Sequence, residues 1–266
     1  MRARKERSCP MGGKSANACW DVVVVGGGHA GSEAALAAAR LGCRTLLVTG
    51  SAEAIACMPC NPSVGGLAKS HLVCELDALG GEMGRNTDLC GIQFRTLNAS
   101  RGPAVRATRV QCDKRQYSLR MRQVVRATAN LDVLEDQVVD LTMAGGTLAG
   151  VRTARHGDLD ARAAVLTTGT ALCGRVYIGK ECVTGAGDGR QAADALSDAL
   201  RACCFELRRL KTGTPPRILA ESIDWNKASI QAGETPPPFF SLMASMFHVE
   251  QCGWCEEVCA TCAKGY

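Results

Sequence analysis

The hydrophobic pattern near the start of the chain predicts a strand, a helix and a second strand. Residues 21–25 (Asp-Val-Val-Val-Val) are a β-branched run of the kind found in buried strands. Residues 32–41 are rich in Ala, carry Leu at helical spacing and are followed by a glycine, while residues 44–48 (Arg-Thr-Leu-Leu-Val) read as a second strand. Because only one short helix separates the two strands, we expect them to pair in parallel.

Farther along, the pattern predicts more helices and a β-meander. Helical spacing marks residues 67–79, a basic amphipathic segment at 113–129, and residues 191–202. Strands separated by Gly-marked turns are expected at residues 131–134, 137–143, 148–155 and 161–167. Residues 88–106 are polar and irregular, which predicts a functional loop instead of packed structure. The sum of these elements is typical of an α/β fold.

Composition narrows the class of protein only a little. The 266 residues are 46% apolar and 21% charged, as in an ordinary globular protein. Sixteen cysteines without a recognisable signal peptide favour reduced thiols and a cytoplasmic protein, and no run of residues approaches membrane-spanning length. The net charge is only +5, but nine basic residues lie between Arg95 and Arg126. That cluster fits either a solvated face or a surface that contacts phosphates.

A glycine motif joins the first predicted strand to the first predicted helix. Gly26, Gly28 and Gly31 match G-x-G-x-x-G, in which the glycines permit a tight turn, close approach of a pyrophosphate and close helix packing. The free N–H groups and positive dipole end of the helix favour the phosphates. The predicted nucleotide contacts are therefore Gly26, Gly27, Gly28, His29, Ala30 and Gly31, with His29 presenting its backbone and not its imidazole.

Two further segments bear on which nucleotide binds. The acidic residue expected at the end of the second strand is not obvious, and Glu53 is the nearest candidate for a ribose contact. Residues 163–170 read as a strand that ends in a small Thr/Gly turn. In flavoproteins with two dinucleotide-binding domains such a turn returns the chain to the cofactor, which favours FAD over NAD. Thr168 and Gly169 are its predicted contacts.

Several longer motifs, in the same order, resemble the MnmG family, formerly called GidA. They are Cys60-Asn-Pro-Ser-Val-Gly-Gly66, Glu75-Leu-Asp-Ala-Leu-Gly-Gly81, Gly91-Ile-Gln-Phe-Arg95, Gly102-Pro-Ala-Val-Arg-Ala-Thr-Arg109 and Arg209-Leu-Lys-Thr-Gly-Thr-Pro-Pro-Arg217. The resemblance runs from residue 21 to about Ser241. It implies a Rossmann-like FAD-binding domain of the glutathione-reductase-like, two-dinucleotide-binding type, here truncated, with the β-meander described above.

The resemblance also implies a function. The family installs a carboxymethylaminomethyl or aminomethyl group on carbon-5 of the wobble uridine of tRNA, together with the GTPase MnmE. It uses FAD, NADH and methylene-tetrahydrofolate, and it forms homodimers. A cytoplasmic location is implied, or a mitochondrial one if the source is a eukaryote. The alternatives are a related folate- and FAD-dependent tRNA uracil-5-methyltransferase, or a truncated fragment without activity.

Functional residues follow from the matched motifs. Cys60 is the candidate catalytic thiol, because a thiolate that attacks carbon-6 of uracil activates carbon-5; the alternative is a small buried packing residue. Val138 matches a backbone contact to the flavin nucleotide. Basic residues expected to contact flavin or tRNA, unless they are only solvated charges, are Lys69, Arg106, Arg109 and Lys211.

The chain departs from the family pattern in two motifs. Pro59 precedes Cys60 where the family usually has Ser. Gln191 stands where the family has a serine that contacts the flavin, which puts that contact in doubt.

The expected organisation has three parts. Residues 1–19 are predicted to be a disordered basic leader, and residues 20–241 the FAD-binding domain, with an inserted second domain beginning near 205–241. Residues 242–266 form a Cys-rich tail with Cys252-x-x-Cys255 and Cys259-x-x-Cys262. Paired C-x-x-C units can hold zinc or an iron–sulfur cluster, but only three residues separate them here. We therefore favour a translated frameshift without bound metal.

Overall fold

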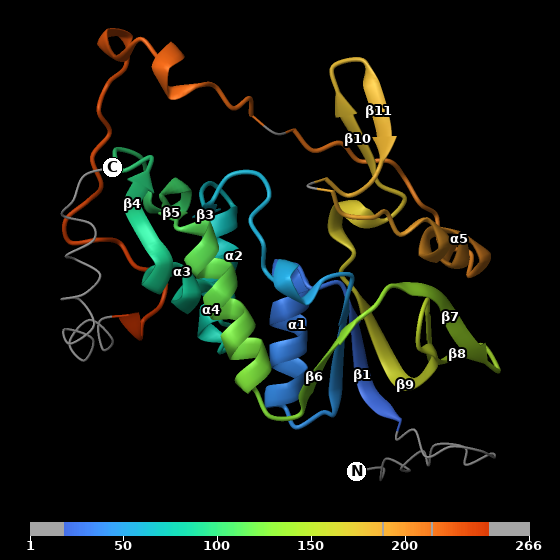
Figure 1. Ribbon diagram of the computed structural model, residues 1–266. Coiled ribbons are helices and arrows are strands. Elements are labelled where there is room, and N and C mark those ends of the chain that lie inside the picture. Colours follow the sequence, from blue (N-terminus) through green and yellow to red (C-terminus); the bar gives the residue numbers. More distant parts are fainter. Residues whose placement is uncertain (1–18, 188, 214, 245–266) are drawn as a thin grey trace. The chain divides into compact units, whose positions relative to one another are not determined.

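The computed structural model describes residues 19–187, 189–213 and 215–244, and the chain divides into two compact units (Figure 1). Unit 1 contains residues 1–54 and 125–209, and unit 2 contains residues 55–124 and 210–266. The predicted leader and most of the predicted Cys-rich tail lie outside the described residues.

Unit 1 is built on a six-stranded sheet with the order β6-β2-β1-β9-β8-β7. Its strands are β1 (Trp20–Val25), β2 (Thr45–Thr49), β6 (Leu131–Glu135), β7 (Val138–Ala144), β8 (Thr147–Thr153) and β9 (Gly157–Leu166). The first four strands of that order pair in parallel, while β9, β8 and β7 form an antiparallel meander. The predicted parallel pair is confirmed, and so is the meander for its last three strands, whereas the strand predicted at residues 131–134 pairs in parallel with β2.

The β-branched runs of unit 1 form its core because both faces of the parallel strands are covered. Helix α1 (His29–Arg40) packs on β1 and β2, and α5 (Asp194–Ala202) packs on β7. Val24 and Leu47, which pair in register, are fully buried. On the opposite face Val23 pairs with Leu46 in the main apolar cluster.

Unit 1 also contains short elements that the sequence pattern did not predict. They are the 3-10 helices η1 (Ala52–Ala54) and η3 (Gly169–Ala171) and a hairpin of β10 (Arg175–Ile178) with β11 (Glu181–Thr184). The helix predicted at residues 191–202 begins three residues later, at Asp194.

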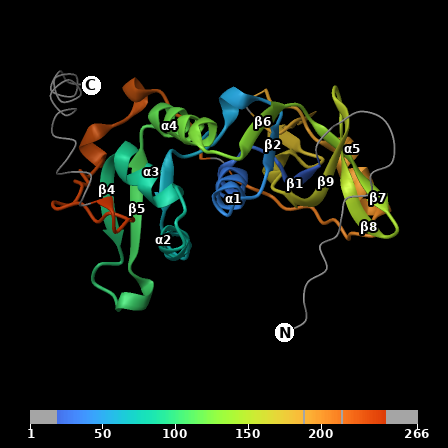
Figure 2. The ribbon, with the colours of Figure 1, turned by 90° about the horizontal axis from the view of Figure 1, so that it is seen from below.

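Unit 2 holds a three-stranded antiparallel sheet with the order β3-β5-β4. Figure 2 labels two of its strands, β4 and β5, together with the helices of this unit. The strands are β3 (Ser63–Gly65), β4 (Gly91–Leu97) and β5 (Ala107–Cys112), and the helices are α2 (Lys69–Ala78), α3 (Met83–Cys90) and α4 (Lys114–Ala127). The last turn of α4 leads back into unit 1. None of the described helices is long and apolar enough to cross a membrane.

The prediction of an irregular loop at residues 88–106 is wrong. The segment contains the end of α3, all of β4 and the 3-10 helix η2 (Pro103–Val105). Strand β4 pairs with β5 along its length, and Phe94 lies opposite the fully buried Val110. The strand was missed because polar residues flank its single aromatic anchor, so that pairing with a distant strand, and not local hydrophobicity, stabilises it.

Residues 215–244 belong to unit 2 and attach to it through polar contacts and through the edge-on packing of Phe239 against Phe94, with ring centroids 5.4 Å apart. They include the 3-10 helices η4 (Ala220–Ser222) and η5 (Trp225–Lys227). The Glu234 amide donates to the Phe94 carbonyl at 2.9 Å, so this segment lies along the outer edge of β4. The buried Asp88 carboxylate accepts from the amides of Phe240 at 2.9 Å and Ser241 at 2.7 Å.

Candidate functional site

The C-terminal ends of the parallel strands in unit 1 meet at one edge of the sheet. Each end leads into glycine or polar residues: Gly26 after β1, Gly50 after β2, Asp136 after β6 and Thr167 after β9. In open α/β sheets this edge is where ligands bind. All the predicted nucleotide contacts lie in unit 1, while Cys60 and the predicted basic contacts lie in unit 2.

Two glycines of the loop are required by packing. Gly26 has a φ of +105°, and a Cβ atom placed there would lie 2.5 Å from the Thr167 carbonyl oxygen. A Cβ at Gly31 would lie 1.7 Å from the Gly26 carbonyl oxygen. The Gly26 amide donates to the Val48 carbonyl at 2.8 Å, which ties the turn to β2. The loop is therefore closed tightly against the ends of three strands.

Gly28 differs from its neighbours because it faces open space. It precedes the first residue of α1 with extended backbone, and a Cβ there would meet nothing within 4 Å. Helix α1 has no side-chain N-cap and no acidic residue in its first turn. The first amides of such a helix are suited to an anion, so the loop fits a pyrophosphate. Gly27 is buried beside it, and Ala30 is exposed.

His29 is the first residue of α1 and is half-buried. Burial lowers the pKa of its imidazole below the ordinary value, which favours the neutral ring at neutral pH. A neutral imidazole adds no full charge to the loop, so attraction for phosphate there has to come from backbone dipoles.

Thr167 directly follows β9, the strand next to β1, and it holds the glycine loop in place. It was not among the residues predicted from the sequence. Its hydroxyl contacts the carbonyl oxygens of Val25 and Gly26, each at 2.9 Å. The two residues that were predicted, Thr168 and Gly169, follow at once: Thr168 precedes η3, and Gly169 has a φ of +54°. A Thr at the end of the strand that neighbours β1 is the signal that could have identified this contact.

Gln191 lies on the segment that pairs with η3. The Ala193 amide donates to the Ala171 carbonyl at 2.7 Å, and Gln191 itself is exposed. The structure thus brings Thr168, Gly169 and the segment of Gln191 together. Val138 is buried at the start of β7, opposite Thr153.

The predicted ribose contact, Glu53, is exposed in η1 and pairs with Arg126 at 3.6 Å. A second carboxylate, that of Glu135, lies at the end of β6 and accepts from the Ala52 amide at 2.8 Å. Glu135 therefore fixes the turn after β2 on which Glu53 stands. The motif places the expected carboxylate at the end of the second strand, β2, so Glu135 at the end of β6 was not predicted.

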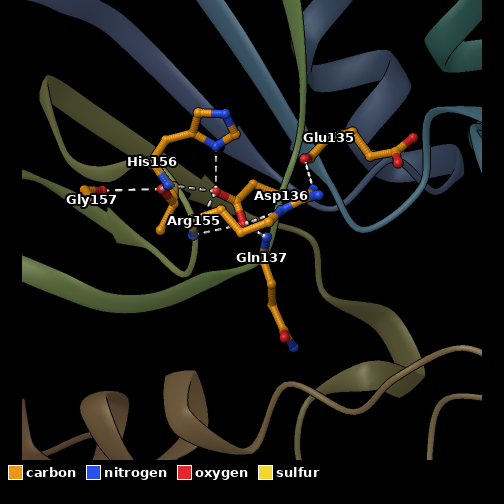
Figure 3. A network of polar contacts seen from close by, with 7 residues as sticks. Glu135, Asp136, Gln137, Arg155, His156 and Gly157 are labelled. Carbon is orange, nitrogen blue, oxygen red and sulfur yellow. Dashed lines mark hydrogen bonds and ion pairs between the residues drawn. The ribbon is translucent and has the colours of Figure 1, made fainter.

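A buried carboxylate, that of Asp136, joins the β6–β7 and β8–β9 turns (Figure 3). Asp136 accepts from the backbone amides of Gln137, Arg155 and His156, and its Oδ2 lies 2.6 Å from His156 Nδ1. Burial by itself raises the pKa of Asp136, but the hydrogen bonds from His156, Gln137 and Arg155 outweigh it and hold that pKa well below its usual range. The ionised carboxylate positions the start of β7.

In unit 2, Cys60 lies in the loop before β3 as a half-buried free thiol. The guanidinium of Arg217 donates to the carbonyl of the preceding residue, Pro59, at 3.3 Å. Cys90 and Cys112 present a contrast. Both are buried, and burial, with smaller charge effects, raises the pKa of Cys90 to about 11 and of Cys112 to about 12. Those two thiols are therefore poor nucleophiles, whereas Cys60 is reachable.

The predicted basic residues are distributed over unit 2. Arg109 in β5 lies directly opposite Arg95 in β4, and Nη1 of Arg95 donates to Oε1 of Gln231 at 2.6 Å. Arg106 is exposed after η2 and donates to the Arg101 carbonyl at 3.0 Å. Lys69, at the start of α2, and Lys211 are also exposed.

Without a bound ligand, the two like charges of Arg95 and Arg109 repel each other across the strands and lower the stability of the sheet. An anion bound on that face of the sheet would offset the cost. Not every member of the basic cluster is free for a ligand, since Arg120 pairs with the buried Glu82 at 2.9 Å.

In the described part of the chain, no group of three or more His, Cys, Asp or Glu residues is placed to hold a metal ion. The four tail cysteines considered for zinc or an iron–sulfur cluster lie outside the described residues.

Comparison with known proteins identifies the family and supports the fold. A family model described as Glucose inhibited division protein A matches residues 21–263. The tRNA uridine 5-carboxymethylaminomethyl modification enzyme MnmG of Wolinella succinogenes is 50% identical over 222 residues, which cover 84% of this chain and 36% of that protein. A structure of GidA from Aquifex aeolicus is 45% identical with a TM-score of 0.80, over 84% of this chain and 37% of that one.

A more distant likeness concerns the fold alone. The GidA-related protein from Thermus thermophilus is 19% identical with a TM-score of 0.52, over 70% of this chain and 68% of that one. The family model reaches residue 263, whereas the alignment with the MnmG relative covers 222 residues, so the end of the resemblance near Ser241 stays a prediction. The chain spans about 36% of the length of the MnmG relative. With its glycine loop, its motif order and its fold in agreement, the chain belongs to the GidA family, also called MnmG.

Proposed function

We propose that unit 1 binds FAD, with its pyrophosphate at the loop between β1 and α1. The observation that carries the proposal is the open approach at Gly28, in front of a helix that has neither a side-chain cap nor an acidic first turn. Backbone amides there can donate to phosphate oxygens while the dipole of α1 favours the negative charge. Thr168, Gly169, Gln191 and Val138 lie on segments of the same unit and are proposed as further contacts.

We propose that the reaction is the modification of carbon-5 of the wobble uridine in tRNA, carried out with the GTPase MnmE. The support is family membership and the 50% identity to an MnmG enzyme, which favours this reaction over the uracil-5-methyltransferase alternative. NADH, methylene-tetrahydrofolate, a homodimer and a cytoplasmic location complete the proposal by family. FAD, when bound, supplies hydride-transfer or carrier chemistry.

Cys60 is the proposed catalytic residue. Its thiolate attacks carbon-6 of the uracil ring, and the electron pair displaced toward carbon-5 makes that carbon nucleophilic. Among the described cysteines of unit 2, the buried Cys90 and Cys112 are unsuited to this step, whereas Cys60 is half-buried on a loop. A Cys60→Ser protein that retains flavin but loses tRNA modification supports the assignment, and full modification by that variant contradicts it.

Binding of FAD is tested by two matched glycine substitutions. A Cβ atom at Gly28 would meet no protein atom within 4 Å, and the rest of a Val side chain would stand in the approach to the α1 amides, so Gly28→Val should fold and lose bound flavin. Gly102→Val is the control, because Gly102 is equally open and has ordinary backbone but lies in unit 2. Flavin absorbance after purification with excess FAD is the measurement. A folded wild-type protein that stays colourless supports the inactive-fragment alternative.

Binding of tRNA is tested on the Arg95–Arg109 face. If both side chains contact phosphates, Arg109→Ala should weaken tRNA binding and reduce the slope of log affinity against log salt by roughly one. Arg152→Ala is a matched control, since Arg152 lies in unit 1 and pairs with Asp158 at 2.8 Å. Equal affinity and equal slope in both variants would remove this face from the proposal.

A further inference from the structure

The loop that carries Cys60 contains a second thiol that the proposed function does not use. Cys57 precedes Cys60 with Met58 and Pro59 between them, so the loop reads Cys-Met-Pro-Cys. C-x-x-C is the spacing of dithiol redox sites, in which two thiols can close a small ring locally. Pro59 is also one of the positions at which this chain departs from the family pattern.

The structure holds the backbone of this loop before the first thiol and between the two thiols. Ile55 and Ala56 are fully buried, and Met58, between the two cysteines, is 3% exposed. The Ser118 hydroxyl donates to the Ile55 carbonyl at 2.7 Å, and Arg217 donates to the Pro59 carbonyl at 3.3 Å. Because the anchors are already ordered, joining the two sulfur atoms removes little further conformational freedom from the folded chain.

The two thiols are close in sequence, and both are accessible to small reagents. Both are free and half-buried, so a small thiol reagent can reach them, unlike Cys90 and Cys112 in the interior of the same unit. The other closely spaced pair among the described residues, Cys203 and Cys204, is adjacent in sequence. A disulfide between adjacent residues is strained, because their Cβ atoms diverge. Cys57 and Cys60 do not carry that constraint.

We propose that Cys57 and Cys60 form a reversible dithiol–disulfide site that reacts with low-molecular-weight disulfides of the glutathione type. The Cys60 thiolate attacks one sulfur of the oxidised reagent, so that a mixed disulfide forms and one thiol leaves. The Cys57 thiolate then attacks the Cys60 sulfur, forming the internal bond and releasing the second thiol. The protein loses two electrons and two protons, and the reagent disulfide is reduced to two thiols.

The chemistry of this site does not depend on flavin or tRNA. Only its consequence rests on the proposed function: in the oxidised state no Cys60 thiol remains to attack uracil, so oxidation would switch off modification reversibly. Loss of flavin binding would therefore leave the dithiol site unaffected, and the two proposals can fail separately.

The site can be measured on the full chain through one peptide. Trypsin cleaves after Arg44 and Lys69, and the peptide of residues 45–69 contains Cys57 and Cys60 as its only cysteines. The protein is equilibrated in buffers of reduced and oxidised glutathione, free thiols are alkylated with one reagent, and disulfides are then reduced and alkylated with a second. Residues 202–208, which contain Cys203 and Cys204 only, provide an internal control.

We expect the amount of 45–69 peptide with both cysteines in the thiol form to fall about tenfold as the buffer becomes oxidising. The thiol form should return when the protein is reduced. The lost material should carry an internal disulfide, whereas the 202–208 peptide should not form one. Cys57→Ser should instead accumulate a mixed disulfide of Cys60 with glutathione, which shows that Cys57 resolves it.

Two outcomes overturn the proposal. One is that both thiols of the 45–69 peptide stay reduced at every ratio of reduced to oxidised glutathione, or that each carries its own glutathione adduct. The other is closure of the pair in urea-unfolded protein at the same buffer ratio as in native protein, since that shows that the anchored loop contributes nothing. Neither result bears on flavin absorbance, which is recorded on the same samples as the independent test of unit 1.

Discussion

Unit 1 and unit 2 differ in the interactions that stabilise them. They also differ in the chemical groups that each offers to a ligand. Unit 1 buries β-branched strands in register, and its candidate site is made of backbone: glycines and helix amides at a sheet edge. Unit 2 pairs its strands antiparallel around the buried Val110 and adds polar contacts from residues far along the chain, and its candidate groups are side chains on β-strands and loops. A backbone site depends on the absence of side-chain atoms, whereas a side-chain site depends on their presence.

The largest expected effect is on the backbone site. In Gly31→Val the new Cβ would lie 1.7 Å from the Gly26 carbonyl oxygen and 2.6 Å from the Thr167 hydroxyl, so the turn must open. We expect a loss of about 4 kcal/mol or more in the free energy of unfolding, measured by urea titration. Gly28→Val should stay within about 0.5 kcal/mol of wild type. If both glycines tolerate Val equally, the distinction between packing and ligand glycines in this loop is wrong.

The next effect tests the polar anchoring of unit 2. Asp88→Asn replaces one of the two carboxylate acceptors of the Phe240 and Ser241 amides with an amide group that cannot accept. A loss of about 2–3 kcal/mol is expected, together with faster proteolysis after residue 230. Asp77→Asn is the control, because the contact of Asp77 with the Leu242 amide is exposed and 3.4 Å long, and it should cost less than about 1 kcal/mol. Equal losses in the two variants would contradict the anchoring role of Asp88.

A smaller effect concerns Asp136 and has a defined pH dependence. The pKa of Asp136 is depressed in the folded state, so its stabilisation is fully present above the unfolded-state pKa of about 3.9 and is lost as pH falls through the folded-state pKa. Asp136→Asn should cost about 2 kcal/mol at neutral pH. Below about pH 4 the wild-type stability should fall more steeply than that of the variant, so that the two unfolding curves approach each other. Parallel curves across the acid range would show that the carboxylate does not titrate as described.

The smallest effect on stability is expected at Glu53. Its ion pair with Arg126 is 3.6 Å long and both side chains are exposed, so Glu53→Ala should change the unfolding free energy by no more than about 0.5 kcal/mol. If Glu53 contacts the ribose of FAD, flavin titration of the same variant should show weaker binding. If Glu53→Ala binds flavin with the wild-type affinity and keeps the wild-type stability, Glu53 serves only in its ion pair with Arg126. Glu135 would then be the next carboxylate to test.

What the sequence could predict also divides along the two units. The Val run, the glycine triplet and the Gly-marked turns predicted β1, α1, β2 and the meander, since each reflects local conformational preference or a continuous buried face. The strands β3, β4 and β5 were not predicted, because three-residue Ser63–Gly65 and the polar β4 have no local signature. Their stability comes from partners far along the chain, such as Val110 for Phe94 and Glu234 for the edge of β4.

The candidate site followed the same rule. Gly26, Gly28 and Gly31 could be predicted because a motif fixes their roles at known spacing. Thr167, which fixes the loop from β9, could not, because its partners Val25 and Gly26 are more than 140 residues away in sequence. The direct pairing of Arg95 with Arg109 likewise appears only when the register of β4 and β5 is known.

The contact of residues 231–234 with β4 has a consequence for solubility. An edge strand with unpaired amides and carbonyls can recruit a strand from another molecule and begin aggregation. Here the outer edge of β4 is occupied by the chain itself, through the backbone of Glu234 and the carboxylate that accepts from Thr96. A shorter version of the protein that stops before residue 230 would expose that edge. Residues 231–234 therefore protect β4 from pairing with another molecule during expression and refolding.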